Sequence, residues 1–254
     1  MVIEPRVPAT VGTLHVHPIT LDDMLRRVDA VIRDGERISI MNVNAHAVCI
    51  AEDDPEFRAA VRASPLVFCD GKAVQWASRS LGNPLPERFT PPDWIDRLCE
   101  LAAANCYGMF FLGGPAGIAS RAADRLTAAH RGLKINSHHG YFDKQGPENE
   151  AVIELINDLR PQLLLVGFGM PLQELWISAN LDRLSVNVAF SVGALFDFVS
   201  GAKARGPRWL TDRGLEWLTR LVREPRRLGR RYLLDNPRFV SIVLRQKLGL
   251  RDRT

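Results

Sequence analysis

Short runs of consecutive apolar residues recur along this chain, and each is followed by a turn and an amphipathic segment. The runs MFFL at 109–112 and LLLV at 163–166 contain no polar residue, which is typical of strands covered by helices on both faces. This alternation predicts an α/β fold, with a Rossmann-like parallel sheet covered by helices. The predicted strands span residues 38–43, 66–69, 109–112, 133–137, 163–167 and 186–191.

Helix boundaries are also visible in the sequence. Thr20 and Asp23 form a capping-box pattern that opens a helix, and Asp34-Gly35 ends it,. A helix is predicted over 46–60, where Asp54 followed by Pro55 offers a second start signal,. These signals place helices between the strands, as a parallel sheet requires.

The C-terminal segment, residues 205–254, differs in charge from the rest of the chain. It contains 13 Arg and one Lys against five acidic residues, a net charge of +9, whereas the whole chain carries +4. Helices are predicted at 209–221 and 228–248, broken by Pro225 and Pro237,. We therefore expect an α/β domain at 1–204 and an arginine-rich helical appendage at 205–254 that associates with phosphates. The densest basic cluster comprises Arg223, Arg226, Arg227, Arg230 and Arg231.

Several functional classes lack their signals. No secretion signal and no apolar run near the roughly 18 residues needed to span a bilayer is present,, so a cytoplasmic protein is expected. The four cysteines form no C-x-x-C pair and are expected to be reduced core thiols,. The absence of a D-x-D sequence argues against a carboxylate-bound metal, and the absence of G-x-S-x-G and P-loop motifs argues against a hydrolase or NTPase,. We expect no cofactor and no bound metal.

Polar turns follow the first two predicted strands. Asn42 and Asn44 close the strand at 38–43, and Asp70-Gly71 follows the strand at 66–69. A carboxylate at a strand end can act as a general base on a hydroxyl. Asp-Gly is equally a common turn pair, so the residues alone leave both interpretations open.

Glycine-rich turns follow two later strands. Gly113 and Gly114 begin the segment GGPAG, which lets the backbone approach a phosphate at a helix N-terminus,. It is not a G-x-G-x-x-G motif, and no ribose-binding acid follows at the next strand end, so a dinucleotide cofactor is disfavoured,. In the segment GFGMPLQE at 167–174, Glu174 could merely favour the helix dipole, whereas stability alone does not readily explain Gln173,.

Taken together, these motifs resemble the WecG/TagA/CpsF family of glycosyltransferases. The resemblance runs from about Asn42 to Tyr232. It rests on the following segments and residues: Asp70-Gly71, Arg88 with Trp94-Ile95, 111–114 (FLGG), 140–142 (GYF), 167–174, 193–197 (GALFD), Gly201, Pro207, 214–217 (GLEW), Arg220, Glu224-Pro225 and Arg231-Tyr232.

The resemblance implies an inverting, metal-independent transfer of a sugar from a UDP-sugar to an undecaprenyl-diphosphate-linked sugar, in the synthesis of a cell-surface polysaccharide. The donor would carry an N-acetylmannosamine-type sugar, its uronate or a hexose. Asp70 would be the general base, and Asn42 and Arg88 would be catalytic with it; Arg88 would bind a diphosphate, and Asn42 stands where the family usually has threonine. The donor and its nucleotide would lie near Asn44, Gly113, Gly114, Tyr141, Gln173 and Asp197. Residues 1–204 would then be the catalytic domain. The arginine cluster of the appendage would bind the acceptor diphosphate or the anionic membrane, which would make the enzyme peripheral on the inner face of the cell membrane.

A second hypothesis comes from another functional class. A nucleotide-binding regulatory protein with a Rossmann-like fold could use the same basic tail to hold RNA or DNA. No recognisable nucleic-acid-binding module accompanies the tail, so we expect no nucleic acid as a partner. The expected partners are a UDP-sugar, a lipid-linked acceptor and an anionic membrane. The sequence does not determine whether the protein forms a homo-oligomer.

Overall fold

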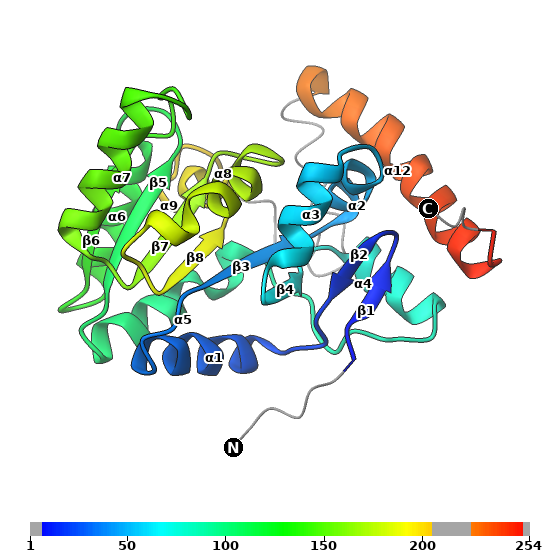
Figure 1. The fold of residues 1–254 in the computed structure, drawn as a ribbon, viewed down its shortest axis with the longest axis horizontal. Helices are drawn as coiled ribbons and strands as arrows, with labels where there is room; N and C mark the ends of the chain where they lie inside the picture. Colours follow the sequence, from blue (N-terminus) through cyan, green and yellow to red (C-terminus); the bar gives the residue numbers. More distant parts are fainter. Residues whose placement is uncertain (1–6, 205–224, 251–254) are drawn as a thin grey trace.

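The computed structural model describes residues 7–204 and 225–250, with side chains in the second range from residue 234 onward. Its centre is a six-stranded sheet in the order β4-β3-β8-β7-β5-β6, in which every neighbouring pair is parallel (Figure 1). This confirms the predicted α/β fold with a parallel sheet. The strands are β3 (Ile38–Val43), β4 (Leu66–Cys69), β5 (Gly108–Gly113), β6 (Lys134–His138), β7 (Leu163–Gly167) and β8 (Val188–Ser191).

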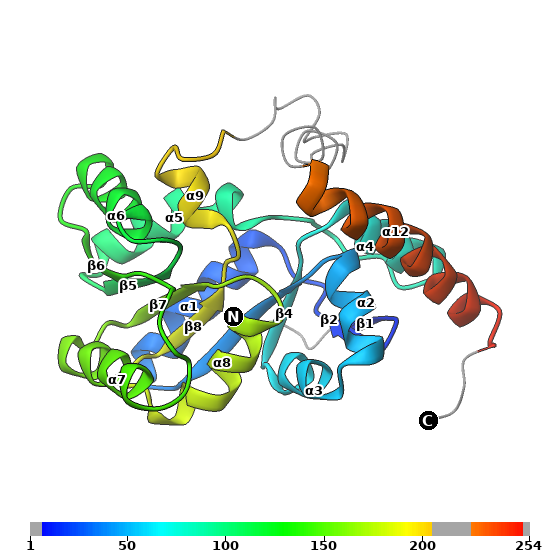
Figure 2. The same ribbon diagram turned by 90° about the horizontal axis from the view of Figure 1, so that it is seen from above.

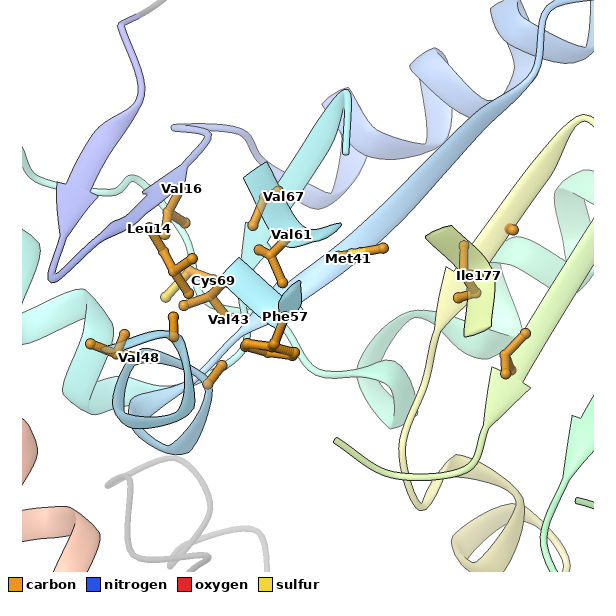
Figure 3. Close-up of a cluster of buried hydrophobic side chains, with 14 of the residues drawn as sticks. Leu14, Val16, Met41, Val43, Val48, Phe57, Val61, Val67, Cys69 and Ile177 are labelled. Atoms are coloured by element: carbon orange, nitrogen blue, oxygen red, sulfur yellow. The ribbon is translucent and has the colours of Figure 1, made fainter. Parts of the chain in front are cut away.

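Helices cover both faces of the sheet, in agreement with the continuous apolar runs of its strands (Figure 2). One face packs against α2 (Ala45–Asp53), α3 (Pro55–Ala63), α7 (Pro147–Leu159) and α8 (Leu172–Asn180). The other packs against α1 (Leu21–Arg33), α5 (Pro91–Ala104), α6 (Ile118–Ala129) and α9 (Leu195–Val199). Figure 3 shows part of the first core, where Met41 and Val43 of β3 lie with Phe57 and Val61 of α3.

Both predicted helix starts are confirmed, and one predicted helix is divided into two. The Asp23 N–H donates to Thr20 Oγ1 at 3.1 Å and the Thr20 N–H donates to Asp23 Oδ2 at 2.9 Å, which is a complete capping box,. Asp54 accepts a hydrogen bond from the Phe57 N–H at 2.9 Å, with Pro55 in the first helical position. The helix predicted at 46–60 is therefore two helices, α2 and α3, because Asp54 caps the second.

The β4 edge of the sheet is covered by elements that the sequence analysis did not predict. The hairpin of β1 (Ala9–Val11) and β2 (Leu14–Val16) leads into His17, whose N–H donates to the Val67 carbonyl at 2.8 Å. The Val67 N–H donates to His17 Nδ1 at 3.0 Å. α4 (Lys72–Ser80) packs against β1 on this side. The hydrogen bonds with His17 give the main chain of β4 partners at an edge that could otherwise pair with a strand of another molecule.

The last helix, α12 (Pro225–Lys247), lies beside α2 (Figures 1 and 2). Phe239 and Val243 are buried in the same core as α2. The prediction that Pro237 breaks this helix was wrong, since α12 continues through it; contacts of the following residues with the body compensate for the hydrogen bond that proline cannot donate. The helix predicted at 209–221 lies outside the described residues.

Polar contacts also hold α12 to the body. His46 Nδ1 lies 2.6 Å from Asp235 Oδ2, and Arg238 pairs with Asp53 of α2. Gln246 accepts from the Gly12 N–H at 2.8 Å in the β1–β2 turn. The second half of α12 is thus seated on α2 and the hairpin by both apolar and polar contacts.

Three of the four cysteines lie in the core, but Cys106 is exposed. The expectation of four core thiols was wrong at this position, because Cys106 sits in the turn after α5 with φ of +58°. Burial raises the pKa of Cys49 to about 11 and that of Cys99 to about 12, so these thiols stay protonated. Within the described residues, no helix has the length and apolar character needed to cross a membrane.

Candidate active site

The carboxyl ends of the six strands form one edge of the sheet, which we call the strand-end edge. Ligands of open parallel sheets bind at such an edge. The predicted site residues from the sheet and its following loops are distributed along it in the order of the strands. They comprise Asp70 after β4, Asn42 and Asn44 at β3, Asp197 after β8, Gln173 after β7, Gly113 and Gly114 at β5, and Tyr141 after β6.

Asp70 and Asn44 are in direct contact. The Asp70 N–H donates to the Val43 carbonyl at 3.0 Å, which fixes the turn after β4 against β3. Asn44 is the N-cap of α2, and its Oδ1 accepts from the Ala47 N–H at 3.1 Å. That bond turns the amide so that Nδ2 donates to Asp70 Oδ2 at 3.2 Å. The cap of one helix thereby orients the carboxylate at the end of the neighbouring strand.

The close approach of these turns depends on Gly71. A Cβ at Gly71 would lie 3.3 Å from the Asn44 Cβ, tighter than most side-chain contacts. Gly71 is also the N-cap residue of α4. The main chain of Asp70-Gly71 therefore forms a turn, and the Asp70 side chain places a carboxylate at the strand-end edge.

Arg88 lies on the same side of the sheet as Asp70. The Phe89 N–H donates to the Cys69 carbonyl at 3.1 Å, which holds this segment against the end of β4. Burial raises the pKa of Cys69 to about 12; the nearby charge of Asp70 adds to this and that of Arg88 opposes it. The Arg88 side chain is 13% exposed, and its guanidinium is 4.0 Å from the Asp93 carboxylate. We call Asn44, Asp70 and Arg88 the acid half of the site.

Asn42 is buried rather than presented at the edge. Its Nδ2 donates to the Ser191 carbonyl at 2.9 Å and lies 3.4 Å from Ser191 Oγ. Both residues are at most 3% exposed. Asn42 thus ties β3 to β8, and its predicted catalytic role with Asp70 stays a prediction.

The ends of β5, β7 and β8 meet through glycines. A Cβ on Gly113 would lie 2.5 Å from the Gly167 carbonyl oxygen, and a Cβ on Gly167 would lie 2.7 Å from the Gly193 carbonyl oxygen. Gly140, after β6, donates its N–H to the Gly114 carbonyl at 2.8 Å. Real Cβ atoms do not approach backbone this closely. Glycine is therefore required here for packing of main chain against main chain. We call these glycines the glycine half.

Gln173 and Glu174 lie under the glycine half and are both fully buried. Gln173 Oε1 accepts from the Gly193 N–H at 3.0 Å and from the Gly169 N–H at 3.2 Å. Gln173 Nε2 donates to Glu174 Oε1 at 2.7 Å. Burial raises the pKa of Glu174 to about 7, although its contacts with Gln173 and Ser191 favour the ionised form. A helix-dipole role alone does not account for a carboxyl group in this position.

The outer end of the site holds an exposed aromatic residue and a lysine held between aromatic rings. Tyr141 is 75% exposed. Lys144 Nζ lies 3.6 Å from the centroid of the Phe142 ring and donates to the Gly140 and Phe142 carbonyls, each at 2.7 Å. Asp197, in the first turn of α9, is 3.7 Å from Lys203. Lys144 could not be found from the sequence, because its surroundings include the ring of Phe168, from the loop after β7, 4.5 Å away.

The structure describes only some of the predicted tail residues, and only their main chain. Arg223 lies outside the described residues. Arg226, Arg227, Arg230 and Arg231 belong to α12, but their side chains lie outside the described residues. In the part of the chain that is described, no three His, Cys, Asp or Glu side chains come together as potential ligands of a metal ion.

Comparison with known proteins gives one family and several relatives. The family model described as the glycosyl transferase WecG/TagA/CpsF family matches residues 9–253. The chain is 28% identical, over 208 residues, to proteins named N-acetylglucosaminyldiphosphoundecaprenol N-acetyl-beta-D-mannosaminyltransferase from Staphylococcus aureus strains MW2 and NCTC 8325. Each alignment covers 82% of this chain and 80% of the relative.

Proposed function

Because the chain belongs to the WecG/TagA/CpsF family of glycosyltransferases, we propose that it transfers a sugar from a UDP-sugar to a sugar carried on a polyprenyl diphosphate. The observation that carries this proposal is the Asn44–Asp70 contact at the strand-end edge, 3.2 Å between Nδ2 and Oδ2, next to the glycine half. A glycosyltransferase needs a base beside a nucleotide site, and these two halves supply them on adjoining strands.

In the proposed reaction, Asp70 acts as the general base. Its carboxylate accepts the proton of the acceptor hydroxyl while that oxygen bonds to the anomeric carbon of the donor sugar. The bond from the anomeric carbon to the β-phosphate oxygen breaks, and UDP leaves with the electron pair. This single displacement inverts the anomeric configuration, and the protonated Asp70 then returns its proton to solvent. Asn44 holds the carboxylate in place, since its own amide is fixed by the α2 cap.

Charge on the departing UDP needs compensation, which we assign to Arg88 and to main-chain groups rather than to a metal ion. The guanidinium can bind a diphosphate through two parallel hydrogen bonds. The first turn of α6, which follows the Gly113-Gly114 turn, contains no acidic residue, and a helix start favours a phosphate. Tyr141 and Asp197 are assigned to the uridine end of the donor, away from the acid half.

The identity of the two substrates rests on the relatives. The Staphylococcus aureus proteins are named for an N-acetylmannosaminyl group and an N-acetylglucosaminyl diphosphoundecaprenol. This supports an N-acetylmannosamine-type donor ahead of its uronate or a hexose, and a polyprenyl-linked N-acetylglucosamine as acceptor.

The experiment is a transfer assay with the full chain. UDP release would be measured with UDP-N-acetylmannosamine, its uronate and UDP-glucose, each with and without a synthetic polyprenyl-diphosphate N-acetylglucosamine. We expect release only when the lipid acceptor is present, and little change with EDTA. Absence of acceptor-dependent release with every donor would contradict the proposed function, and strong inhibition by EDTA would contradict metal independence.

We further propose that the basic appendage at 205–254 brings the enzyme to the inner face of the cell membrane, where a polyprenyl acceptor resides. Support comes from Val240 and Leu244 of α12 and from Leu248 directly after it, which are 53%, 53% and 69% exposed. They recur every four residues and so share one side of the helix, away from the buried Phe239 and Val243. An apolar stripe beside arginines is typical of a helix lying at a membrane surface.

Charge substitutions in the appendage test this association. Arg226→Gln with Arg230→Gln should weaken binding to phosphatidylglycerol vesicles by roughly thirtyfold, because each arginine near an anionic surface contributes about 1 kcal/mol. Flotation with the vesicles measures the effect. The matched control, Arg131→Gln with Lys134→Gln in the body, removes the same charge and should leave flotation unchanged. Equal losses in both variants would mean that overall charge, not the appendage, mediates binding.

A further inference from the structure

The amide of Gln173 joins two loops of the glycine half. Its Oε1 accepts from the Gly169 N–H, in the loop after β7, and from the Gly193 N–H, in the loop after β8. One carbonyl oxygen thus sets the distance between two adjacent strand-end loops. The bond lengths, 3.2 and 3.0 Å, are those of ordinary N–H···O hydrogen bonds,.

This arrangement requires one orientation of the amide. If the amide were turned over, its NH₂ group would face two N–H donors, and neither glycine would have an acceptor. Glu174 selects the observed orientation, because its Oε1 accepts from Gln173 Nε2 at 2.7 Å. Because Glu174 Oε1 accepts from the NH₂ group of Gln173, the Gln173 carbonyl oxygen must point toward Gly169 and Gly193.

Glu174 also lies near polar groups of β8 and β3. The Ser191 side chain is close enough to favour the ionised form of its carboxyl group, although Glu174 Oε2 has no hydrogen-bond partner among the described residues. The Ser191 carbonyl oxygen accepts from Asn42 Nδ2 at 2.9 Å. Asn42 is two residues from Asn44, which orients Asp70. All four buried residues of this polar chain, Asn42, Ser191, Gln173 and Glu174, are at most 3% exposed. These residues belong to β3, β8 and α8, and Gln173 is the one that contacts the glycine half.

We propose that Glu174 is a positioning residue of the donor site, acting through Gln173 to hold the loops after β7 and β8 at the spacing that the nucleotide requires. The role needs an acceptor oxygen and no negative charge, since a neutral carboxyl or an amide accepts the same hydrogen bond. An uncharged group is also what the surroundings favour, because an isolated buried charge is costly. The proposal rests on the proposed function for the identity of the donor, but its structural part concerns the loops alone.

Two substitutions separate the acceptor from the charge. Glu174→Leu removes the acceptor and leaves Gln173 Nε2 unpaired, whereas Glu174→Gln keeps an acceptor without charge. With UDP as the probe, calorimetry on the full chain should give a dissociation constant about tenfold higher for Glu174→Leu, the size of effect expected when a buried donor loses its partner. Glu174→Gln should recover most of that loss. A Glu174→Gln variant as impaired as Glu174→Leu would overturn the proposed role.

The matched control lies at the opposite end of the sheet, where β5 begins. The Gly108 N–H donates to Gln162 Oε1 at 2.7 Å, so Gln162→Leu also leaves a donor unpaired but away from the strand-end edge. Both leucine variants should lower the melting temperature. Only Glu174→Leu should weaken UDP binding, and an equal loss of binding in Gln162→Leu would reduce Glu174 to a structural residue.

Hydrogen exchange provides a readout that does not depend on the donor. Amide exchange in segments 167–171 and 191–195 should rise in Glu174→Leu and stay near wild type in Glu174→Gln and Gln162→Leu. Unchanged exchange in Glu174→Leu would overturn the proposal even if UDP binding fell. If wild-type protein bound no UDP, the donor assignment would fail, while the exchange pattern would still decide the role of Glu174.

Discussion

The two halves of the strand-end edge are built from different parts of the chain. In the acid half, side chains face one another: Asn44 is fixed by the α2 cap and in turn orients the Asp70 carboxylate. In the glycine half, main chain packs against main chain, and a Cβ on Gly113 or Gly167 would lie within 2.7 Å of a neighbouring carbonyl oxygen. The first half can supply a proton acceptor, and the second can supply only shape and main-chain polarity.

This difference predicts how each half responds to substitution. A change at Asp70 or Asn44 of the acid half that keeps the fold should alter the rate of the chemical step, whereas Arg88 is assigned to the diphosphate. A change in the glycine half must move loops, so it should alter nucleotide binding and stability together. Kinetics that mixed these effects in both halves would show that the division between them is wrong.

The largest effect is expected from Asp70→Asn. The amide cannot accept the acceptor's proton, so kcat should fall by about 10²- to 10⁴-fold, the usual contribution of a general base. UDP binding measured by calorimetry should stay near the wild-type value. Asp124→Asn, at an exposed position of α6, is the control and should retain normal kcat. Substantial turnover by Asp70→Asn would remove this residue from the role of base.

A smaller effect, of a different kind, is expected from Gly167→Ala. The added methyl would lie 2.7 Å from the Gly193 carbonyl oxygen and 3.0 Å from the Phe196 ring, so the loops must shift. We expect a loss of stability of about 1–3 kcal/mol, typical of overpacking, and weaker UDP binding. Thermal unfolding and calorimetry measure the two effects.

The control for this substitution is at the other end of the same sheet. A Cβ on Gly108, where β5 begins, would meet its nearest atom only at 3.6 Å. Gly108→Ala should therefore leave UDP binding unchanged. If Gly167→Ala bound UDP as tightly as Gly108→Ala, the glycine half would have no part in the nucleotide site.

The smallest and most selective effect is expected from Asn44→Ser. Serine still caps α2, so the melting temperature should change little. It lacks the Nδ2 donor to Asp70, so kcat should fall by about tenfold, the effect of one lost hydrogen bond to a charged group. Asp54→Ser, which preserves the cap of α3 far from Asp70, should change neither quantity. A normal kcat in Asn44→Ser would show that the amide does not orient the base.

Much of the architecture follows from local sequence signals. Strands β3, β4 and β7 begin and end at the predicted residues, because each is a short, mainly apolar segment followed by a turn. The capping signals at Thr20 and Asp54 also worked, since a cap depends only on the residues next to it. The family membership was likewise predictable, because the strand-end motifs retain their order and spacing in this chain.

The sequence by itself determined the parallel sheet, the placement of polar and glycine-rich turns at the strand ends, and the concentration of charge in the appendage. Only the tertiary structure decided that Asn42 is buried against Ser191, that Gln173 and Glu174 lie beneath the loops, and that α12 continues through Pro237 to pack on α2. The physical reason is the range of the forces involved. Apolar runs and caps act between neighbours in sequence, whereas the burial and orientation of a polar side chain depend on partners brought from distant strands and helices.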